Sequence, residues 1–160
     1  MGNYFPASEP PDMRELYNFL GQYWSRALYF GEVPSHFFWP SELVESDREV
    51  PPVRLWGNLV LTGYICSLVR NHFDSPLTIT SGYRDPAYNQ KVGGTPRSMH
   101  ILGKAADIKV GGHSPEEVYD FLDGHEIREQ IALGIYNSFV HVDHRHWDFP
   151  VPDPIRWDMR

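Results

Sequence analysis

The most constraining feature of the sequence is a change in hydrophobic periodicity near residue 75. Before this point, apolar side chains recur at steps of three and four residues, which is typical of helices that bury one face. After it, short β-branched or alternating segments predict strands. Helices followed by strands predict an α+β fold, with amino-terminal helices packed on a small, mostly antiparallel sheet. The expected helices are 13–28, 52–73 and 114–122, with short elements at 41–44 and 85–89, and the expected strands are 77–80, 104–110, 131–136 and 138–143.

The composition excludes several classes of protein. The 160 residues carry a formal charge of −7, so a general affinity for nucleic acid phosphates is not expected. Cys66 is the only cysteine, which excludes an intramolecular disulfide. No apolar run approaches the roughly 20 residues of a membrane span, and the first residues lack the pattern of a signal peptide. We therefore expect a monomeric single domain, synthesised in the cytoplasm, without a nucleic acid partner or a membrane span.

Two separate segments offer side chains that bind metal ions. His100 and Asp107 lie seven residues apart with Gly103 between them, so a turn can bring them together. His141 and Asp143 alternate with valines and share one face of an expected strand. Two histidines and one carboxylate are the ligand count of a catalytic zinc that keeps one position open. The alternatives without a metal are a capped turn with a surface carboxylate and a hydrogen-bonded core histidine.

An arginine follows the first expected strand. Residues 80–84 end that strand and lead Arg84 into a loop. The planar guanidinium group matches the geometry of a carboxylate. Arg84 is therefore a candidate for holding the terminal carboxylate of a substrate, and a surface ion pair with Asp85 is the alternative.

Three ordered blocks resemble those of a known family. The pattern Ser-x-His-x-x-Gly-x-Ala-x-Asp is met at every fixed position over 98–107. Segments 81–84 and 139–143 are similar to the upstream block and to the block that holds the third ligand. On these residues the chain resembles the zinc D-Ala-D-Ala peptidases of the M15 type. These include cell-wall carboxypeptidases and phage endolysins, and they share a fold with the Hedgehog signalling domain.

The resemblance implies roles for individual residues. Arg84 is implied to meet the substrate carboxylate during catalysis, and Ser98 to assist substrate binding. In the mechanism that we expect, Ser98 or Tyr83 donates to a substrate peptide group. A Zn²⁺ ion is the implied cofactor. Its implied ligands are His100, Asp107 and His141.

One position departs from the family pattern. Many members place a catalytic acid three residues before the third ligand, where this chain has Ser138. Asp143, on the same strand face as His141, is the general base that we expect instead. In a second interpretation His146 is the third ligand, because Asp143 then stands three residues before it. In a third interpretation, the catalytic activity has been lost and only metal binding remains.

The expected function follows from the resemblance. Residues 51–147 are the expected zinc peptidase core, preceded by a helical extension and connection at 1–50 and followed by an extended tail at 148–160, all within one domain. The expected activity is hydrolysis of peptide bonds in peptidoglycan stem peptides, as a D-Ala-D-Ala carboxypeptidase or an endolysin-like endopeptidase. The protein would act on the cell wall, and a phage-encoded or virion-associated origin is open. The alternative function is a catalytically inactive, zinc-stabilised module that binds cell wall or a protein.

Overall fold

A five-stranded sheet organises the carboxy-terminal half of the chain. The computed structural model describes residues 12–29, 38, 40–44 and 49–160, with the backbone alone for 23–29. The strand order is β1-β2-β4-β3-β5, and every pairing is antiparallel except the parallel pair β3–β5. The strands are β1 (Leu77–Ser81), β2 (Ala105–Val110), β3 (Ala132–Ile135), β4 (Val140–Asp143) and β5 (Arg156–Asp158).

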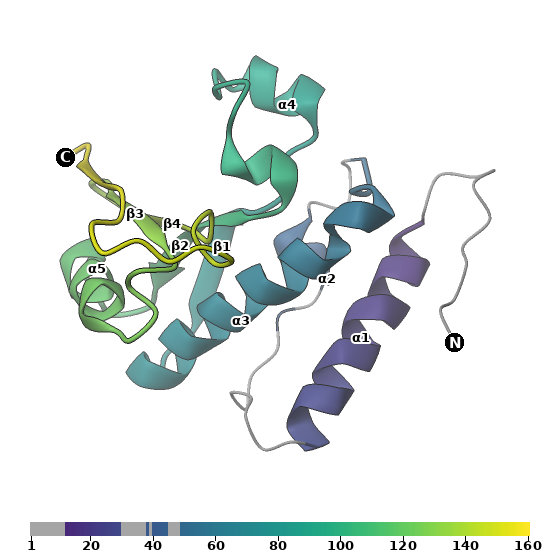
Figure 1. Cartoon of the computed structure of the whole chain (residues 1–160), viewed down its shortest axis with the longest axis horizontal. Helices are drawn as coiled ribbons and strands as arrows, with labels where there is room; N and C mark the ends of the chain where they lie inside the picture. The colour runs from purple at the N-terminus through teal and green to yellow at the C-terminus, as the bar shows by residue number, and fades with distance from the viewer. Residues whose placement is uncertain (1–11, 30–37, 39, 45–48) are drawn as a thin grey trace.

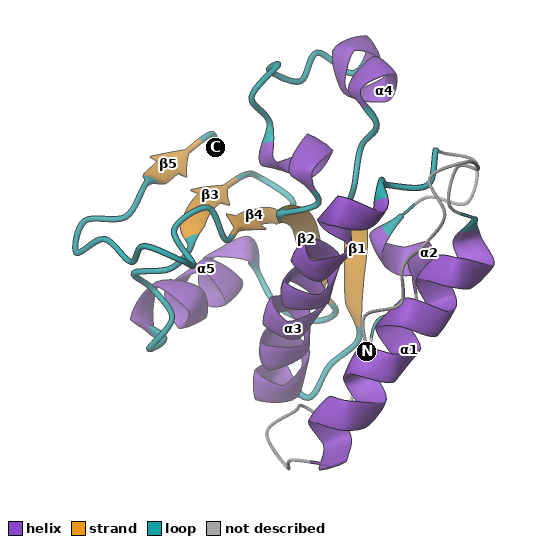
Figure 2. Ribbon diagram, turned by 45° about the vertical axis from the view of Figure 1, so that its right-hand side comes forward, coloured by secondary structure: helices purple, strands orange, loops and turns teal. Residues whose placement is uncertain are grey.

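Helices cover one face of this sheet. α3 and α5 contact the strands directly, and α1 packs on the outer side of α3 (Figures 1 and 2). The connection between β1 and β2 contains α4 and the 3₁₀ helix η2, and α4 projects away from the body of the molecule (Figure 1). The helices are α1 (Met13–Tyr29), α2 (Pro40–Leu43), η1 (Val53–Leu55), α3 (Trp56–Phe73), α4 (Pro86–Lys91), η2 (Met99–Leu102) and α5 (Pro115–Gly124).

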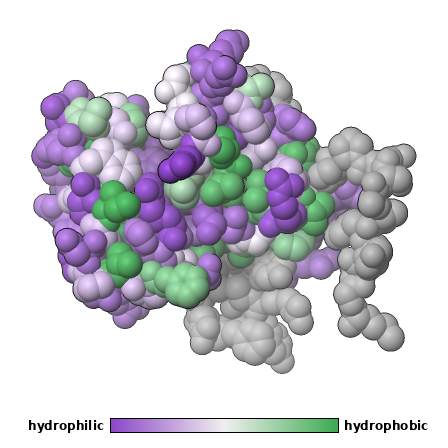
Figure 3. Space-filling view, turned by 45° about the horizontal axis from the view of Figure 1, so that its top comes forward, coloured by the Kyte–Doolittle hydropathy of each residue, from purple (hydrophilic) through white to green (hydrophobic). Residues whose placement is uncertain are grey.

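The hydrophobic core lies between the sheet and the helices. On β2 and β4 the apolar side chains of Ile108, Val140 and Val142 are at most 2% exposed. They belong to the same buried cluster as Leu59 of α3 and Leu122 of α5. Because side chains alternate along a strand, the residues between these apolar positions project from the opposite face of the sheet. On the outside, hydrophobic residues lie between hydrophilic ones across the face in view (Figure 3).

Side-chain caps fix where several helices begin, among them α1 and α5. The Asp12 carboxylate accepts a hydrogen bond from the Glu15 backbone N–H at 2.8 Å. Ser114 and Glu117 form a reciprocal capping box at the start of α5. Both arrangements satisfy backbone donors that have no partner within the helix. Among the described helices, none combines the length and the apolar character needed to cross a bilayer.

The expected α+β fold with a mostly antiparallel sheet is confirmed. The expected helix at 52–73 is divided into η1 and α3, and part of the expected extension and connection at 1–50 lies outside the described residues. Two elements were not expected, namely η2 and the strand β5 within the tail at 148–160. Strand β5 has only three residues and exists through its pairing with β3, so hydrophobic periodicity could not indicate it.

Candidate metal centre

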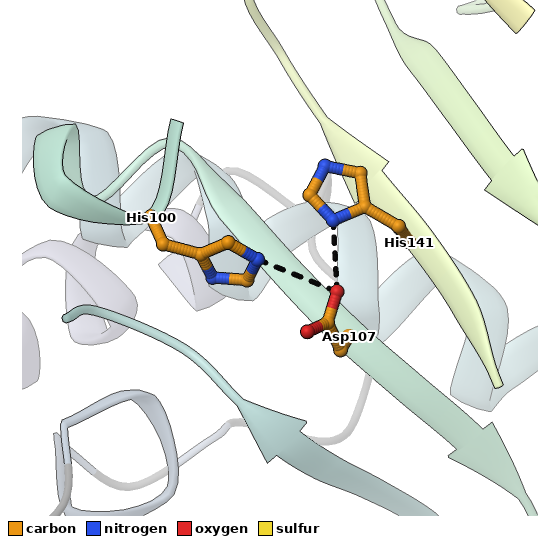
Figure 4. A group of neighbouring side chains, drawn as sticks. All are labelled: His100, Asp107 and His141. Atoms are coloured by element: carbon orange, nitrogen blue, oxygen red, sulfur yellow. Dashed lines mark hydrogen bonds and ion pairs between the residues drawn. The ribbon is translucent and has the colours of Figure 1, made fainter. Parts of the chain in front are cut away.

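Three neighbouring elements bring His100, Asp107 and His141 together on the open face of the sheet. Asp107 on β2 lies directly opposite His141 on β4. His100 comes from η2, which precedes β2. All three side chains point toward one another (Figure 4). They are buried, with residue exposures of 3%, 7% and 9% respectively.

The donor atoms of these side chains fit a metal ion. Asp107 Oδ1 lies 3.3 Å from His100 Nε2 and 2.8 Å from His141 Nδ1. One ligand atom from each residue lies within 4.8 Å of the others. Ligands about 2.0–2.1 Å from a tetrahedral zinc are separated by about 3.4 Å, which is close to these spacings. Nitrogen and carboxylate donors are also ligands that zinc accepts, and three of them leave a fourth position open.

Each of the three side chains is also held at an atom that faces away from the cluster. His100 Nδ1 lies 2.7 Å from the Gly82 carbonyl oxygen, which can only accept, so Nδ1 carries the proton and Nε2 is free to bind a metal. Asp107 Oδ2 accepts a hydrogen bond from Arg84 Nη2 at 2.9 Å. His141 Nε2 lies 3.1 Å from Asp143 Oδ2. Such outer partners orient metal ligands and select the histidine tautomer.

Glycines place the backbone for these contacts. At Gly82 any Cβ atom would overlap the backbone of Leu43, so only glycine lets the chain pass here and present its carbonyl to His100. Gly103 ends η2 with φ +64°, in the left-handed region that glycine adopts without a steric cost. The chain can therefore turn from His100 into strand β2 within a few residues.

Hydrogen bonds within the cluster lower the pKa of Asp107 and raise the pKa of His141. Burial alone would raise the pKa of Asp107, but hydrogen bonds with His100 and His141 hold that pKa well below its usual range. Burial alone would lower the pKa of His141, but hydrogen bonds with Asp107 and Asp143 raise it. Asp107 is therefore a carboxylate at neutral pH, which is the form that binds a metal ion.

Asp143 is enclosed by other side chains. Arg145 donates from Nε to Oδ1 at 2.8 Å and from Nη2 to Oδ2 at 2.6 Å, and the Asp143 side chain is 0% exposed. Although burial opposes it, the contacts with Arg145 and His141 lower the pKa of Asp143 to about 2. Asp143 is weakly basic, closed to solvent and in contact with His141 Nε2, whereas Asp107 contacts Nδ1 of the same ring. These contacts argue against the predicted general-base role of Asp143.

Arg84 lies next to the cluster, as a substrate anchor should. Its Nε donates to Ser81 Oγ at 2.8 Å, and its Nη2 donates to Asp107. Within the described part of the chain, Nη1 makes no hydrogen bond. The guanidinium group therefore braces a proposed metal ligand and has one nitrogen left for a substrate.

Two other predicted substrate contacts have different surroundings. Ser98 caps η2, where its Oγ accepts a hydrogen bond from the His100 backbone N–H at 3.3 Å. Tyr83 is 4% exposed and belongs to the hydrophobic core. Its neighbours Gly82 and Arg84 serve the metal centre, and the alternation of an extended chain directs Tyr83 to the other side. The prediction that Tyr83 contacts a substrate does not fit this position.

The alternative third ligand lies elsewhere. His146 is absent from the group of donors that could hold a metal, and its backbone N–H bonds to the Gln130 carbonyl oxygen. Ser138, at the family's acid position, is exposed beyond the end of β3. The geometry therefore favours His141 over His146 as the third metal ligand.

Three residues at the centre were missed by sequence reasoning. Arg145 follows Asp143 by two residues, and this spacing is the signal from which their pairing could have been inferred. Gly134 and Trp157 lie on β3 and β5, and Trp157 packs beside His141. Sequence spacing contains no signal for Trp157, because its position depends on the parallel pairing of β5 with β3.

Comparison with known proteins agrees with this geometry. The family model described as Peptidase M15 matches residues 53–143, which is more than half of the chain. The chain belongs to the peptidase M15 family. The matched segment contains all three residues of the cluster and ends at Asp143, whereas β5 lies beyond it.

A curated relative supports the choice of metal. The chain is 32% identical over 82 residues to the zinc D-Ala-D-Ala carboxypeptidase of Streptomyces albus G. This match covers 48% of the chain and 32% of the relative, so the chain spans about a third of the relative's length. Family, relative and donor set together identify zinc as the cofactor.

Proposed function

We propose that this M15 protein is a zinc-dependent peptidase that cleaves peptide bonds in peptidoglycan stem peptides. The observation that carries the proposal is the buried cluster of His100, Asp107 and His141, in which each side chain is held by a separate outer partner. Preorganised ligands of this kind are typical of metal sites, whereas a chance group of polar residues lacks such support. The name of the Streptomyces albus G relative supports the substrate class.

We assign different residues of the centre to metal binding, substrate binding and the orientation of a ligand. His100 Nε2, Asp107 Oδ1 and His141 Nδ1 are the atoms that we assign to the metal. Zinc, when bound, supplies a Lewis acid that polarises a peptide carbonyl and activates water. Arg84 Nη1 is the group that we assign to a substrate carboxylate or carbonyl. Ser98 keeps His100 in place through its cap on η2.

The charge balance of the centre supports an anionic substrate. Arg84 pairs with Asp107, and Arg145 pairs with Asp143, so each carboxylate already has a cationic partner. A divalent ion would therefore leave the site with a net positive charge. Because the surroundings are buried, this charge is weakly screened and attracts a carboxylate more strongly than it would in water. The terminal carboxylate of a stem peptide meets this requirement.

The experiment that tests the proposal is digestion of purified peptidoglycan and of a synthetic stem peptide ending in D-Ala-D-Ala. Products are identified by mass spectrometry, with and without a chelator, and after zinc is restored. We expect release of products that stops with chelator and returns with zinc. Loss of one terminal alanine identifies a carboxypeptidase, and internal fragments identify an endopeptidase.

A second candidate function is a zinc-stabilised module without hydrolytic activity. The specific observation in its favour is the lack of an evident base, since Ser138 is a serine and Asp143 is enclosed by Arg145 and His141. Such a module would bind one equivalent of zinc and bind peptidoglycan. Zinc-loaded protein that releases no product from either substrate would favour this module over the peptidase.

We also propose how the chain is organised into a domain. The helices α1, α3 and α5 and the strands β1 to β4 contribute residues to one hydrophobic core, which supports a single domain with residues 51–147 as its functional part. We predict that the protein is a monomer and that it acts on the cell wall. A phage-encoded or virion-associated source is a further prediction.

A further inference from the structure

One row of residues crosses four strands at the metal centre. Asp107 lies opposite His141, and His141 lies opposite Gly134 on its other side. Gly134 in turn lies opposite Trp157. Residues that are opposite one another in neighbouring strands project from the same face. Trp157 therefore shares the face and the level of two proposed zinc ligands.

Gly134 leaves the space through which Trp157 reaches the centre. A Cβ atom at Gly134 would overlap atoms of the Trp157 indole ring, so the ring occupies the position that any side chain there would need. With that space open, the indole extends across β3 to His141. The two ring centroids lie 5.2 Å apart, with the ring planes at 47°.

The indole is itself fixed by its surroundings. Trp157 Nε1 donates to the Tyr136 hydroxyl at 3.2 Å, and the Tyr136 ring stacks on Phe139 with centroids 4.3 Å apart. The neighbouring residue Arg156 ties β5 to the rest of the fold, since its Nε donates to Asp123 Oδ1 at 2.7 Å. Its Nη1 also donates to the Ile131 carbonyl oxygen at 2.7 Å. Trp157 is thus a rigid neighbour of His141.

We propose that Trp157 is a positioning residue for His141, and that strand β5 is therefore part of the zinc centre. Asp143 holds Nε2 of the ring, and the indole packs beside the ring and limits its movement and its contact with water. A hydrophobic neighbour of this kind controls solvent access to a metal site. The inference rests on the proposed zinc ligands, and it places a residue beyond the matched segment 53–143 at the site.

The test compares Trp157→Ala with Trp157→Phe and with the control Trp147→Ala in the full chain. Trp147 is also partly buried against the core, but it packs on Tyr64, with ring centroids 6.4 Å apart. Zinc affinity is measured by competition with a chelating dye, and the centre is probed by the absorption spectrum of the Co²⁺-loaded protein. We expect Trp157→Ala to weaken zinc binding by about 10–100-fold and to change the Co²⁺ spectrum. Trp157→Phe should retain most of the affinity, and Trp147→Ala should lower thermal stability without either change.

A milder variant keeps the inference testable if Trp157→Ala does not fold. Tyr136→Phe removes only the hydroxyl that accepts from the indole, and we expect a smaller loss of zinc affinity in the same direction. Wild-type affinity and an unchanged Co²⁺ spectrum in Tyr136→Phe and in any folded Trp157→Ala would overturn the role of Trp157. Absence of zinc binding by the wild-type protein would instead overturn the proposed function.

Discussion

The two faces of the same sheet are built on different principles. On the helix-covered face, Ile108, Val140 and Val142 contribute apolar surface to one continuous core. On the open face, Asp107 and His141 are also buried, although slightly less completely, and they depend on individual hydrogen bonds. Residues adjacent in sequence thus serve different purposes, because successive side chains of a strand project to opposite faces.

This difference predicts how each face responds to change. Burial of apolar surface is non-directional, so the helix-covered face should tolerate exchanges that conserve volume. The open face consists of charges and polar atoms that are costly to bury without their partners. Substitutions on the first face should therefore change the free energy of unfolding, and those on the second should mainly change zinc binding and activity.

The largest effect is expected for Asp107→Ala. This change removes the carboxylate that both histidines share and the ionic partner of Arg84. We expect zinc affinity to fall by more than about 100-fold, beyond the effect of losing an outer partner, and hydrolysis to fall to background. Metal content after dialysis measures zinc binding, and product release measures hydrolysis. Asp120→Ala on the exposed side of α5 is the control, and full zinc binding by Asp107→Ala would contradict the ligand assignment.

On the opposite face, Ile108→Ala should act on stability alone. Ile108 is 1% exposed, and removal of its side chain leaves a cavity in the core. We expect the free energy of unfolding to fall by about 2–5 kcal/mol, as measured by denaturant titration of the zinc-free protein. The conservative change Ile108→Val should cost about 0.5–1.5 kcal/mol. If the folded Ile108→Ala protein loses its zinc affinity, the two faces are not independent.

The third prediction concerns His144, which joins α3 to the end of β4. Its Nε2 lies 3.1 Å from Thr62 Oγ1, and burial, reinforced by the charge of Lys104, lowers its pKa to about 4. As the pH falls from about 6.5 to 4, the unfolded chain takes up a proton that the folded chain does not. The free energy of unfolding should therefore fall by about 3 kcal/mol over this window through His144, and be independent of it above pH 6.5.

The contribution of His144 is isolated by comparing zinc-free wild-type protein with zinc-free His144→Gln. Both are unfolded by denaturant across this pH range. Other groups titrate in both proteins and cancel in the difference. The variant should show a shallower loss of stability toward low pH. Parallel pH profiles for the two proteins would show that His144 takes up its proton equally in the folded and unfolded states.

The smallest expected effect distinguishes two roles for Asp143. If Asp143 orients His141, Asp143→Asn should weaken zinc binding by about 10–100-fold, because an outer partner of a ligand is altered. If it were the general base, zinc binding would remain and only turnover would fall. Zinc affinity and kcat measured on the same preparation separate these outcomes. Asp12→Asn is the matched control, since that carboxylate is exposed and pairs with Arg14.

Local sequence signals predicted much of the fold. The 3- and 4-residue repeats predicted the helices α1 and α3, and alternation predicted β2 with Asp107 off its apolar face. The cap, proline and acidic residues at 114–117 predicted α5. The ordered motif residues of 98–107 and 139–143 indicated the site, and their residues His100, Asp107 and His141 do lie together. These signals succeed because each depends on a few neighbouring residues and on the geometry of one element.

The tertiary structure alone decided which atoms have partners. The sequence determined that a carboxylate and two histidines of the M15 pattern were present, together with an arginine near them. Only the contacts between distant segments decided that Asp143 is buried and that Tyr83 belongs to the core. They also brought Trp157 across Gly134 to His141. The physical reason is that burial and pairing across strands depend on distant segments, which local periodicity does not encode.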